Sequence, residues 1–389
     1  MSFLSGTMPQ APPSQKAGIY IHIPFCRHKC PYCDFYSLPL KEASINLDEY
    51  VQALLKEWEL RRPETEGLQF HSLYLGGGTP SLLSLRQIAL IIDSLGPALT
   101  PKAEITLEAN PETIDDIWLK GIRSLGVNRI SLGIQSLSAR GLEILRRHHG
   151  RRQALMAIEA ARLAGFTNIS VDIIFGWPGQ RPQDLEAELH ELLGLNPEHI
   201  SCYELTIEEG TLFASWVKEG RIQPLGEESL TFFHLLVEEI LTSGGFKRYE
   251  ISNYALKGRE CRHNLIYWEN RPYLGLGAWA VSYLKGTRSQ NPKLPLYLHY
   301  LASGHSPPRI EERLDLEATF RETTVLGLRL IKGISISELK GRFGIDPIHY
   351  YKTELEHLMA AGLIEIKRGR LRLTKQGRLL ADEVGAYLV

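Results

Sequence analysis

The stretch at residues 20–35, YIHIPFCRHKCPYCDF, holds three of the five cysteines of this 389-residue chain. Cys26, Cys30 and Cys33 follow the spacing Cys-x3-Cys-x2-Cys, and three thiols so close together cannot all pair as disulfides. The spacing therefore indicates a metal or cluster loop. A cuboidal [4Fe-4S] cluster usually takes four cysteine ligands, so a loop that supplies three would leave one iron open to another ligand.

A structural zinc loop is the alternative interpretation, with His22 or His28 as the fourth ligand. Structural zinc sites usually combine two separate cysteine pairs, whereas Cys202 and Cys261 each stand alone in this sequence. The pattern therefore favours a cluster. The isolated cysteines also fit a reducing compartment better than a disulfide framework, and we expect a cytoplasmic protein.

Composition excludes several classes of protein. The chain has 44 Lys and Arg against 45 Asp and Glu, and 43% of its residues are hydrophobic, which is typical of a soluble globular protein with no overall basic character. No apolar run approaches the roughly 18 residues of a membrane span. Residues 1–17 lack the pattern of a secretory signal, and their Pro, Ser and Gln content predicts a disordered leader.

From residue 19 onward, short apolar segments alternate with amphipathic helical patterns. The expected strands are 19–23, 72–75, 104–108, 129–133, 168–174 and 199–205. The expected helices are 47–60, 85–95, 113–124, 152–164 and 182–193. This repetition predicts an α/β fold with a parallel sheet. Six repeats are fewer than the eight of a closed barrel, so we predict a partial (β/α)6 barrel over residues 18–210. A doubly wound sheet is the alternative, because periodicity does not separate the two.

Two further regions follow the expected barrel. Residues 211–313 are dense in Gly, Pro, Tyr and Trp and are expected to extend the barrel. Residues 314–389 read as three helices, two short strands around a Gly turn and a last helix, which is the outline of a winged-helix-like domain. We expect this domain to pack beside the barrel. Four basic residues of the hairpin leave DNA binding open as an alternative: Lys367, Arg368, Arg370 and Arg372.

Glycines and polar residues recur where the predicted strands end. Gly76-Gly77-Gly78-Thr79-Pro80 follows the second strand, and successive glycines let a backbone approach a ligand closely. Later strands end with Glu108, Asn110 and Gln135 or contain Asp172. Each of these alone is as consistent with a satisfied buried polar group as with a ligand contact. Because they occupy equivalent ends of one barrel, together they predict a shared polar ligand.

The segments CRHKCPYCDF, GGGTPS, LEANPE, SLGIQS, LRRHH and VDIIFGWPGQ together resemble the radical S-adenosylmethionine (SAM) superfamily. More narrowly, they are similar to the branch of oxygen-independent coproporphyrinogen III oxidases and HemW-type heme chaperones. The resemblance implies that Cys26, Cys30 and Cys33 hold a [4Fe-4S] cluster whose fourth iron binds SAM, and that reduction cleaves SAM to a 5′-deoxyadenosyl radical. The implied SAM site consists of Tyr20, Gly77, Gly78, Thr79, Glu108, Gln135, Arg147 and Asp172. Tyr32 either packs near the adenine or packs against the cluster loop.

Two departures distinguish members within this branch. The oxidases carry a fourth cysteine where this chain has Phe35, and they carry an extension where this chain has only 25 residues before Cys26. The segment at 261–268, CRHNLIYW, resembles the HNxxYW signature of HemW proteins. It implies that His263 is an axial ligand to heme iron and that the adjacent aromatic residues stack on the porphyrin. The alternative is a loop histidine beside two core aromatics, with Cys261 either a buried small residue or a thiolate ligand.

The resemblance therefore implies a heme chaperone that binds [4Fe-4S], SAM and heme and passes heme to an acceptor protein. It also implies an electron donor for the cluster, with no nucleic-acid partner and with transient contact with a membrane surface left open. The first alternative is a radical SAM enzyme that oxidatively decarboxylates coproporphyrinogen III. The second is a radical SAM protein that acts on nucleic acid through its winged-helix-like end.

Overall fold

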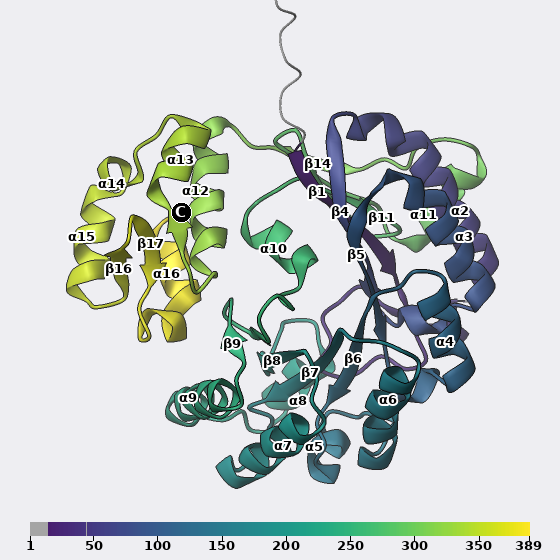
Figure 1. Cartoon of the computed structure of the whole chain (residues 1–389), viewed down its shortest axis with the longest axis horizontal. Coiled ribbons are helices and arrows are strands. Elements are labelled where there is room, and N and C mark those ends of the chain that lie inside the picture. Colours follow the sequence, from purple (N-terminus) through teal and green to yellow (C-terminus); the bar gives the residue numbers. More distant parts are fainter. Residues whose placement is uncertain (1–14, 44) are drawn as a thin grey trace, which may run out of the picture.

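A computed structural model describes residues 15–43 and 45–389. Its main sheet contains twelve strands in the order β14-β13-β12-β11-β1-β4-β5-β6-β7-β8-β10-β9 (Figure 1). Six neighbouring parallel strands form the barrel: β1 (Gln15–Ile23), β4 (Leu68–Gly77), β5 (Leu99–Ala109), β6 (Arg129–Gln135), β7 (Ile169–Phe175) and β8 (His199–Glu204). The order of these six strands in the sheet is the same as their order in the chain. A doubly wound sheet would instead reverse its strand order at one point. The predicted partial barrel is confirmed.

The barrel begins earlier than the sequence indicated. Of the expected leader at 1–17, residues 1–14 lie outside the described part of the chain. Its last three residues, Gln15 to Ala17, belong to β1 and pair with β4. Backbone pairing with a neighbouring strand therefore overrides the polar composition of this segment.

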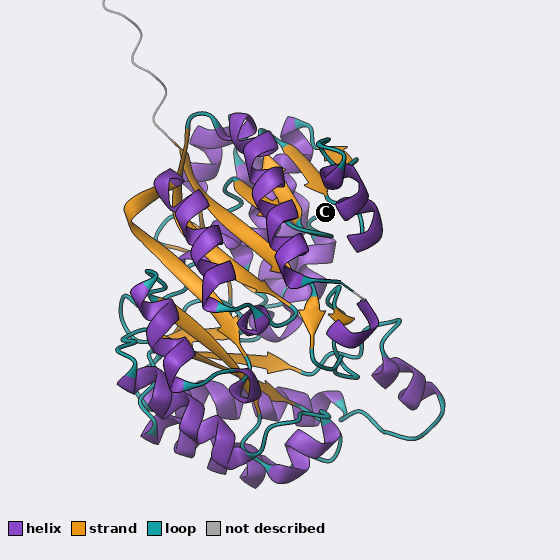
Figure 2. Ribbon diagram, turned by 90° about the vertical axis from the view of Figure 1, so that its right-hand side faces the viewer, coloured by secondary structure: helices purple, strands orange, loops and turns teal. Residues whose placement is uncertain are grey.

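Five helices cover the outer face of the barrel strands (Figure 2). They are α2 (Leu47–Arg61), α3 (Leu85–Leu95), α4 (Asp116–Ser124), α6 (Arg151–Leu163) and α7 (Pro182–Gly194). The largest difference from the expected boundaries is at α4, which was predicted from residue 113. Pro111–Thr113 forms a short 3-10 turn instead, and the Asp115 side chain accepts a hydrogen bond from the Trp118 N–H, which starts the helix there.

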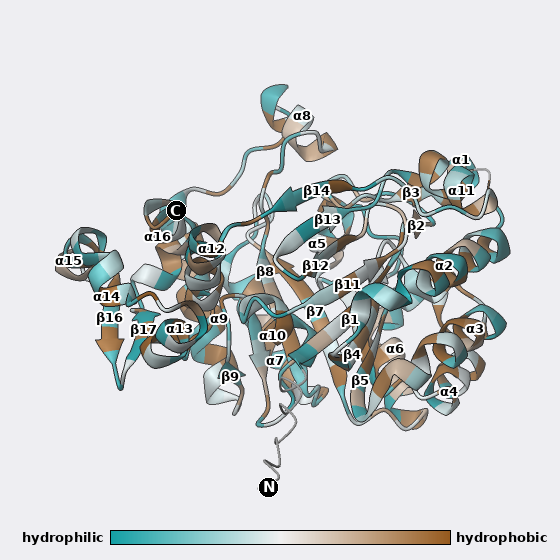
Figure 3. Ribbon diagram, turned by 90° about the horizontal axis from the view of Figure 1, so that it is seen from above, coloured by the Kyte–Doolittle hydropathy of each residue, from teal (hydrophilic) through white to brown (hydrophobic). Residues whose placement is uncertain are grey.

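Apolar and polar side chains alternate along the barrel strands, so one face of the sheet is apolar and the face toward the barrel interior is polar. In β6, Ile130, Leu132 and Ile134 are fully buried in the main core, while Ser131 and Gln135 line the barrel cavity. Side chains two residues apart on a strand share a face. The helices that cover the apolar layer combine hydrophobic and hydrophilic stretches (Figure 3). The hydrophobic core therefore lies between sheet and helices, and the barrel interior is free to bind a polar ligand.

Residues 211–313 extend the sheet at both edges. Next to β8 lie β10 (Asn253–Ala255) and β9 (Lys247–Arg248). Next to β1 lie β11 (Tyr273–Leu276), β12 (Val281–Leu284), β13 (Thr287–Gln290) and β14 (Ile310–Arg313). The helices of this region are α8 (Leu212–Lys218), α9 (Glu227–Ser243), α10 (Arg262–Trp268) and α11 (Leu294–Ala302). Figure 1 shows α10 between the arc of barrel strands and the C-terminal domain.

The C-terminal region has its own hydrophobic core around Phe320 and Leu371. Its helices are α12 (Leu316–Leu328), α13 (Ile336–Phe343), α14 (Pro347–Tyr350), α15 (Lys352–Ala360) and α16 (Ala381–Tyr387), and its strands are β15 (Ile334–Ser335), β16 (Ile364–Lys367) and β17 (Arg370–Leu373). This order matches the winged-helix-like outline. Arg370 donates to the Gly333 carbonyl at 2.7 Å and Arg372 pairs with Glu365. Two of the four cations on which the DNA-binding alternative depended are therefore already engaged.

Candidate functional site

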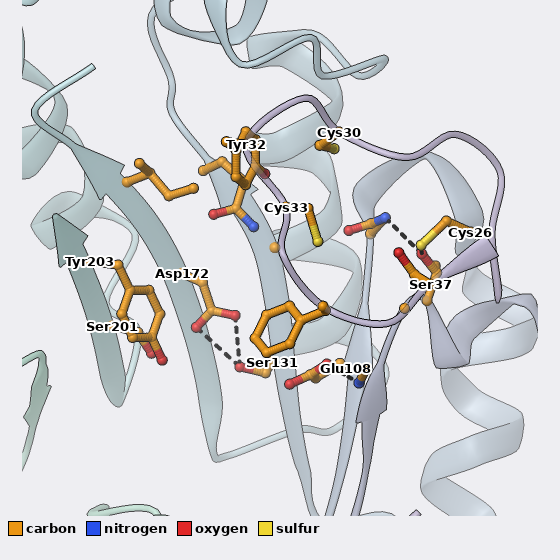
Figure 4. Close-up of a pocket in the computed structure, with 18 of the residues that line it drawn as sticks. Cys26, Cys30, Tyr32, Cys33, Ser37, Glu108, Ser131, Asp172, Ser201 and Tyr203 are labelled. Atoms are coloured by element: carbon orange, nitrogen blue, oxygen red, sulfur yellow. Dashed lines mark hydrogen bonds between the residues drawn. The ribbon is translucent and has the colours of Figure 1, made fainter. Parts of the chain in front are cut away.

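A cavity of about 390 Å³ lies at the C-terminal ends of the barrel strands, within the range typical of small-molecule sites. The cluster loop forms its upper wall, and polar side chains from the strands face it from below (Figure 4). The predicted site residues that line it are Cys26, Cys30, Tyr32, Cys33, Gly77, Gly78, Thr79, Glu108, Gln135, Arg147 and Asp172. The structure therefore brings together residues that are up to 146 positions apart in the chain (172 − 26).

Close backbone contacts hold the cluster loop against the glycine turn. Cys26 ends β2 (Phe25–Cys26), which pairs with β3 (Leu38–Pro39) ahead of the short helix α1 (Leu40–Ala43). The Gly78 N–H donates to the Ile23 carbonyl at 2.9 Å. A Cβ added at Gly78 would lie 2.6 Å from the carbonyl oxygen of Phe25. Only glycine allows this approach, which explains why the turn is glycine-rich.

Arg147 supplies a half-buried positive charge beside the cysteines. Its Nη1 lies 3.4 Å from the Cys30 Sγ, and its Nη2–H donates to Asn110 Oδ1 at 2.7 Å and to the Gly133 carbonyl at 2.9 Å. Arg147 precedes α6 and comes after α5 (Ala139–Ile144). A fixed guanidinium offsets the negative charge that thiolate ligands bring into a buried site.

A second set of hydrogen bonds orients Glu108 in the middle of the cavity. The Tyr74 hydroxyl donates to Glu108 Oε1 at 2.7 Å, and the Gly77 N–H donates to Oε2 at 3.1 Å. Burial, reinforced by the nearby Asp172, raises the pKa of Glu108 to about 7. Burial also raises the pKa of Asp172, whose carboxylate accepts a hydrogen bond from the Ser131 hydroxyl at 3.2 Å. The charge of the nearby Arg129 offsets these increases only in part, so the two carboxyl groups still favour a positively charged ligand.

Gln135 enters the cavity through a strained backbone. Its φ is +66°, in the left-handed region that residues other than glycine rarely adopt. This conformation ends β6 and places the Gln135 side chain among the lining residues. Strain of this kind is often found at ligand sites.

The zinc alternative offered His22 or His28 as the fourth ligand, and the two histidines lie in different surroundings. Within residues 15–43 and 45–389, no group of three or more His, Cys, Asp or Glu side chains, the loop cysteines included, is already arranged around a single metal position. His22 is engaged elsewhere, with Nε2 2.8 Å from the Tyr36 carbonyl and Nδ1 2.9 Å from the Tyr20 hydroxyl. His28 lies with its ring centroid 4.0 Å from that of His148.

Two predicted site residues lie outside this cavity. Tyr20 lines a neighbouring groove, and its hydroxyl contacts His22. His263 lies inside the barrel and is only 1% exposed. Its Nδ1 is 2.8 Å from the Ser72 Oγ and its Nε2 is 2.9 Å from the Tyr267 hydroxyl, so both ring nitrogens are occupied. Burial lowers the pKa of His263 to about 3, which keeps the ring neutral.

Glu104 explains why His263 is buried. Its carboxylate accepts hydrogen bonds from the Arg262 N–H at 2.9 Å and the His263 N–H at 3.4 Å at the start of α10, a position that favours negative charge. The Cys261 Sγ also lies 3.6 Å from the same carboxylate, and burial raises the pKa of this thiol to about 12. Cys261 is fully buried, as the interpretation of this cysteine as a small buried residue expects.

Several further residues line the cavity that the sequence did not single out: Arg129, Ser131, Ser201 and Tyr203. Arg129 is the most notable, because it is 2% exposed and its Nε and Nη1 have no hydrogen-bond partner among the described residues. The period-2 pattern Arg129, Ser131, Gly133, Gln135 marks these positions as the face opposite the core. This alternation along β6 is the signal from which the sequence could have identified Arg129 and Ser131 as cavity residues.

The chain is similar to known protein families and to individual proteins over most of its length. A model of the radical SAM superfamily matches residues 20–192, and a model of the HemN C-terminal domain matches residues 314–380. A heme chaperone HemW from Mycobacterium tuberculosis is 36% identical over 376 residues, covering 96% of this chain and 94% of that protein. A heme chaperone HemW from Synechocystis is 40% identical over 331 residues, covering 82% and 79%.

The chain belongs to the HemW family of radical SAM proteins. The solved structure of coproporphyrinogen III oxidase (HemN) from Escherichia coli matches with a TM-score of 0.80 over 97% of this chain and 90% of that one, at 23% identity. At that identity the match shows a shared fold. No helix in the described part of this HemW-family chain is long and apolar enough to span a membrane.

Membership of the radical SAM superfamily implies a [4Fe-4S] cluster and SAM, and the residues fit both. Three thiols on one loop provide three cluster ligands and leave a fourth position open. The Thr79 hydroxyl lies 3.5 Å from the Cys26 Sγ, and Arg147 lies beside Cys30. The two buried carboxyl groups, Glu108 and Asp172, suit the positively charged groups of SAM.

Proposed function

We propose that the chain is a heme chaperone that binds a [4Fe-4S] cluster and SAM and passes heme to an acceptor protein. The observation that carries this proposal is the similarity, over nearly the whole chain, to several proteins named heme chaperone HemW. Phe35 in place of a fourth loop cysteine and the HNLIYW segment at 263–268 support it. Both features set this chain apart from the coproporphyrinogen oxidases that it resembles in fold.

In this proposal, Cys26, Cys30 and Cys33 hold the cluster and Arg147 offsets its charge. When bound, the cluster would supply the electron that cleaves SAM. Glu108, held by the Gly77 N–H, orients the polar end of SAM, and Asp172 attracts its positive charge. Gly78, Thr79, Gln135 and Tyr32 complete the lining. Tyr20 lines the neighbouring groove with its hydroxyl 2.9 Å from the His22 Nδ1, and its part in the SAM site stays a prediction.

The affinity for SAM is expected to rise with pH through neutrality. Because the pKa of Glu108 is raised to about 7, this carboxyl is mostly protonated below pH 7 in the free protein. A positively charged ligand favours the ionised form, so binding must first release that proton. Affinity should rise about tenfold per pH unit below 7 and level off above it. Equilibrium dialysis of labelled SAM with cluster-loaded protein between pH 5.5 and 8 measures this slope.

Glu108→Gln is the control for that titration, because it keeps the side-chain volume and removes the titrating group. It should bind SAM more weakly and with a shallower pH dependence. A wild-type affinity that stays constant across this range would show that Glu108 does not face the bound ligand.

Titration with hemin under anoxic conditions tests the proposed function. We expect a saturable change in the Soret band at one heme per chain in the wild type, and its loss in His263→Ala. The matched control is His199→Ala. His199 is also fully buried, with Nδ1 2.8 Å from the Ser170 Oγ and Nε2 3.0 Å from the Tyr249 hydroxyl.

The two histidines thus sit in the same kind of serine–histidine–tyrosine arrangement, and only His263 belongs to the HNxxYW segment. His199→Ala should bind hemin like the wild type. If the wild type shows no saturable hemin binding, the proposed function is wrong. If His199→Ala and His263→Ala lose binding equally, the loss reflects damage to the fold and His263 is not the ligand.

A further inference from the structure

A second cavity lies beside the cluster cavity and differs from it in character. It is an open groove of about 550 Å³ whose walls include Phe35, Tyr36, Tyr267, Trp268, Tyr273 and Trp279. We call it the aromatic groove. Phe35 and its neighbour Asp34 line both cavities, so the loop segment that follows Cys33 separates them. Phe35 is 62% exposed and lies among the other aromatic residues of the groove.

The aromatic groove lies next to His263 but does not include it. The Tyr267 ring lines the groove, while its hydroxyl lies 2.9 Å from the His263 Nε2. On the other side of the ring, the His263 Nδ1 lies 2.8 Å from the Ser72 Oγ. A histidine that binds a metal through Nε2 usually donates its Nδ1–H to a nearby acceptor. Ser72 is placed to be that acceptor, and Tyr267 occupies the position that a metal would take.

We propose that the aromatic groove is the seat of the porphyrin and that Tyr267 separates it from His263. This inference rests on the proposed heme-binding function. A porphyrin is a planar aromatic ring, and aromatic side chains such as Tyr36 and Trp279 offer surfaces on which it stacks. Heme ligation by His263 then requires the Tyr267 hydroxyl to leave the imidazole and the Tyr267 ring to move.

The charged residues at the aromatic groove also suit a porphyrin. Arg288 is the cation among its lining residues and pairs with the Glu322 carboxylate at its rim. A porphyrin propionate is also a carboxylate, so it can compete with Glu322 for Arg288, and Glu322 would then keep its hydrogen bond from the Asn270 amide. The apolar ring and the acidic edge of a heme thus each meet a complementary part of the groove.

Three variants test this inference, with hemin as the probe and the full cluster-loaded chain as the protein. Trp279→Ala should weaken hemin binding at least tenfold, because it removes a large aromatic surface on which the porphyrin stacks. Phe232→Ala, an exposed aromatic on α9 that lies outside both cavities, is the control and should bind like the wild type. Tyr267→Phe should bind about fivefold more tightly, because it removes one hydrogen bond that competes with the heme iron.

Tryptophan fluorescence gives an independent readout of position. Two of the six tryptophans, Trp268 and Trp279, line the aromatic groove, and bound heme quenches nearby tryptophans. Trp279→Phe should therefore reduce the amplitude of quenching.

Three outcomes would contradict the inference or its basis. Wild-type hemin affinity in Trp279→Ala would show that the porphyrin does not bind in the aromatic groove. Loss of binding in Tyr267→Phe, with binding kept in His263→Ala, would make Tyr267 the ligand and overturn its role as a separator. If the wild type binds no hemin, the proposed function itself is wrong.

Discussion

Cys30→Ala is expected to lose the iron–sulfur cluster and, with it, tight binding of SAM. Only three cysteines belong to the cluster loop, and the other two, Cys202 and Cys261, are buried away from it. The variant would leave two thiols for a cluster that already has one open position. Iron and acid-labile sulfide after anoxic reconstitution should fall from about four of each per chain to a small fraction of that. Dialysis of labelled SAM should show a parallel loss.

Cys202→Ala is the matched control for this experiment. It also removes one thiol, but from the core between the sheet and its helices. It should retain wild-type iron and SAM binding with a modest loss of stability. If Cys30→Ala retained the full iron content, the loop would not be a cluster site, and the interpretation of the cavity above the barrel would be wrong.

The second large effect is expected at Glu57, a fully buried carboxylate on α2. It lies 3.3 Å from the Arg61 Nη1 and accepts hydrogen bonds from the Gly277 N–H, the Asn291 amide and the Tyr297 hydroxyl at 2.7–2.8 Å. These partners belong to α11 and to segments around β11–β13, so Glu57 joins them to the barrel helix. Glu57→Ala would leave these donors unpaired and would remove one of the two carboxylates that pair with the buried Arg61, the other being Glu64. We expect the free energy of unfolding to fall by about 3–5 kcal/mol.

Glu59→Ala, two residues along the same helix, is the comparison. The Glu59 side chain is 68% exposed and pairs with Lys56 at the surface, so its removal should change the free energy of unfolding by less than about 1 kcal/mol. Urea denaturation of both variants measures the difference. Equal midpoints for Glu57→Ala and Glu59→Ala would mean that the buried network does not hold the sheet extension to the barrel.

Local sequence patterns predicted the barrel and its polar interior well. In β6, Ile130, Leu132 and Ile134 alternate with Ser131 and Gln135, and this period alone separates the core face from the cavity face. The barrel strands lie side by side in the order in which they occur in the chain. This follows because each crossover is short and right-handed crossovers keep the helices on one side of the sheet. The candidate site followed, since parallel strands end at the same edge.

The position of α10 could not be predicted in the same way. Besides the Glu104 contacts, the buried position of His263 depends on Gly18, 245 positions earlier in the chain (263 − 18): a Cβ there would lie 3.0 Å from the His263 Nδ1. The surroundings of Tyr20 are a related case. It lies on β1, and the pairing of β11 with that strand creates the groove that Tyr20 faces. Neither long-range pairing leaves a periodic signal in the sequence.

The central claim is that this radical SAM barrel carries heme instead of converting a porphyrinogen. The most direct measurement incubates reduced, cluster-loaded protein with SAM and coproporphyrinogen III under anoxic conditions and follows products by chromatography. An oxygen-independent coproporphyrinogen III oxidase, run in parallel, shows that the assay works. We predict that coproporphyrinogen III remains unchanged in the presence of protein that binds one hemin per chain. Accumulation of protoporphyrinogen IX over several turnovers would contradict the claim and make the chain an oxidase.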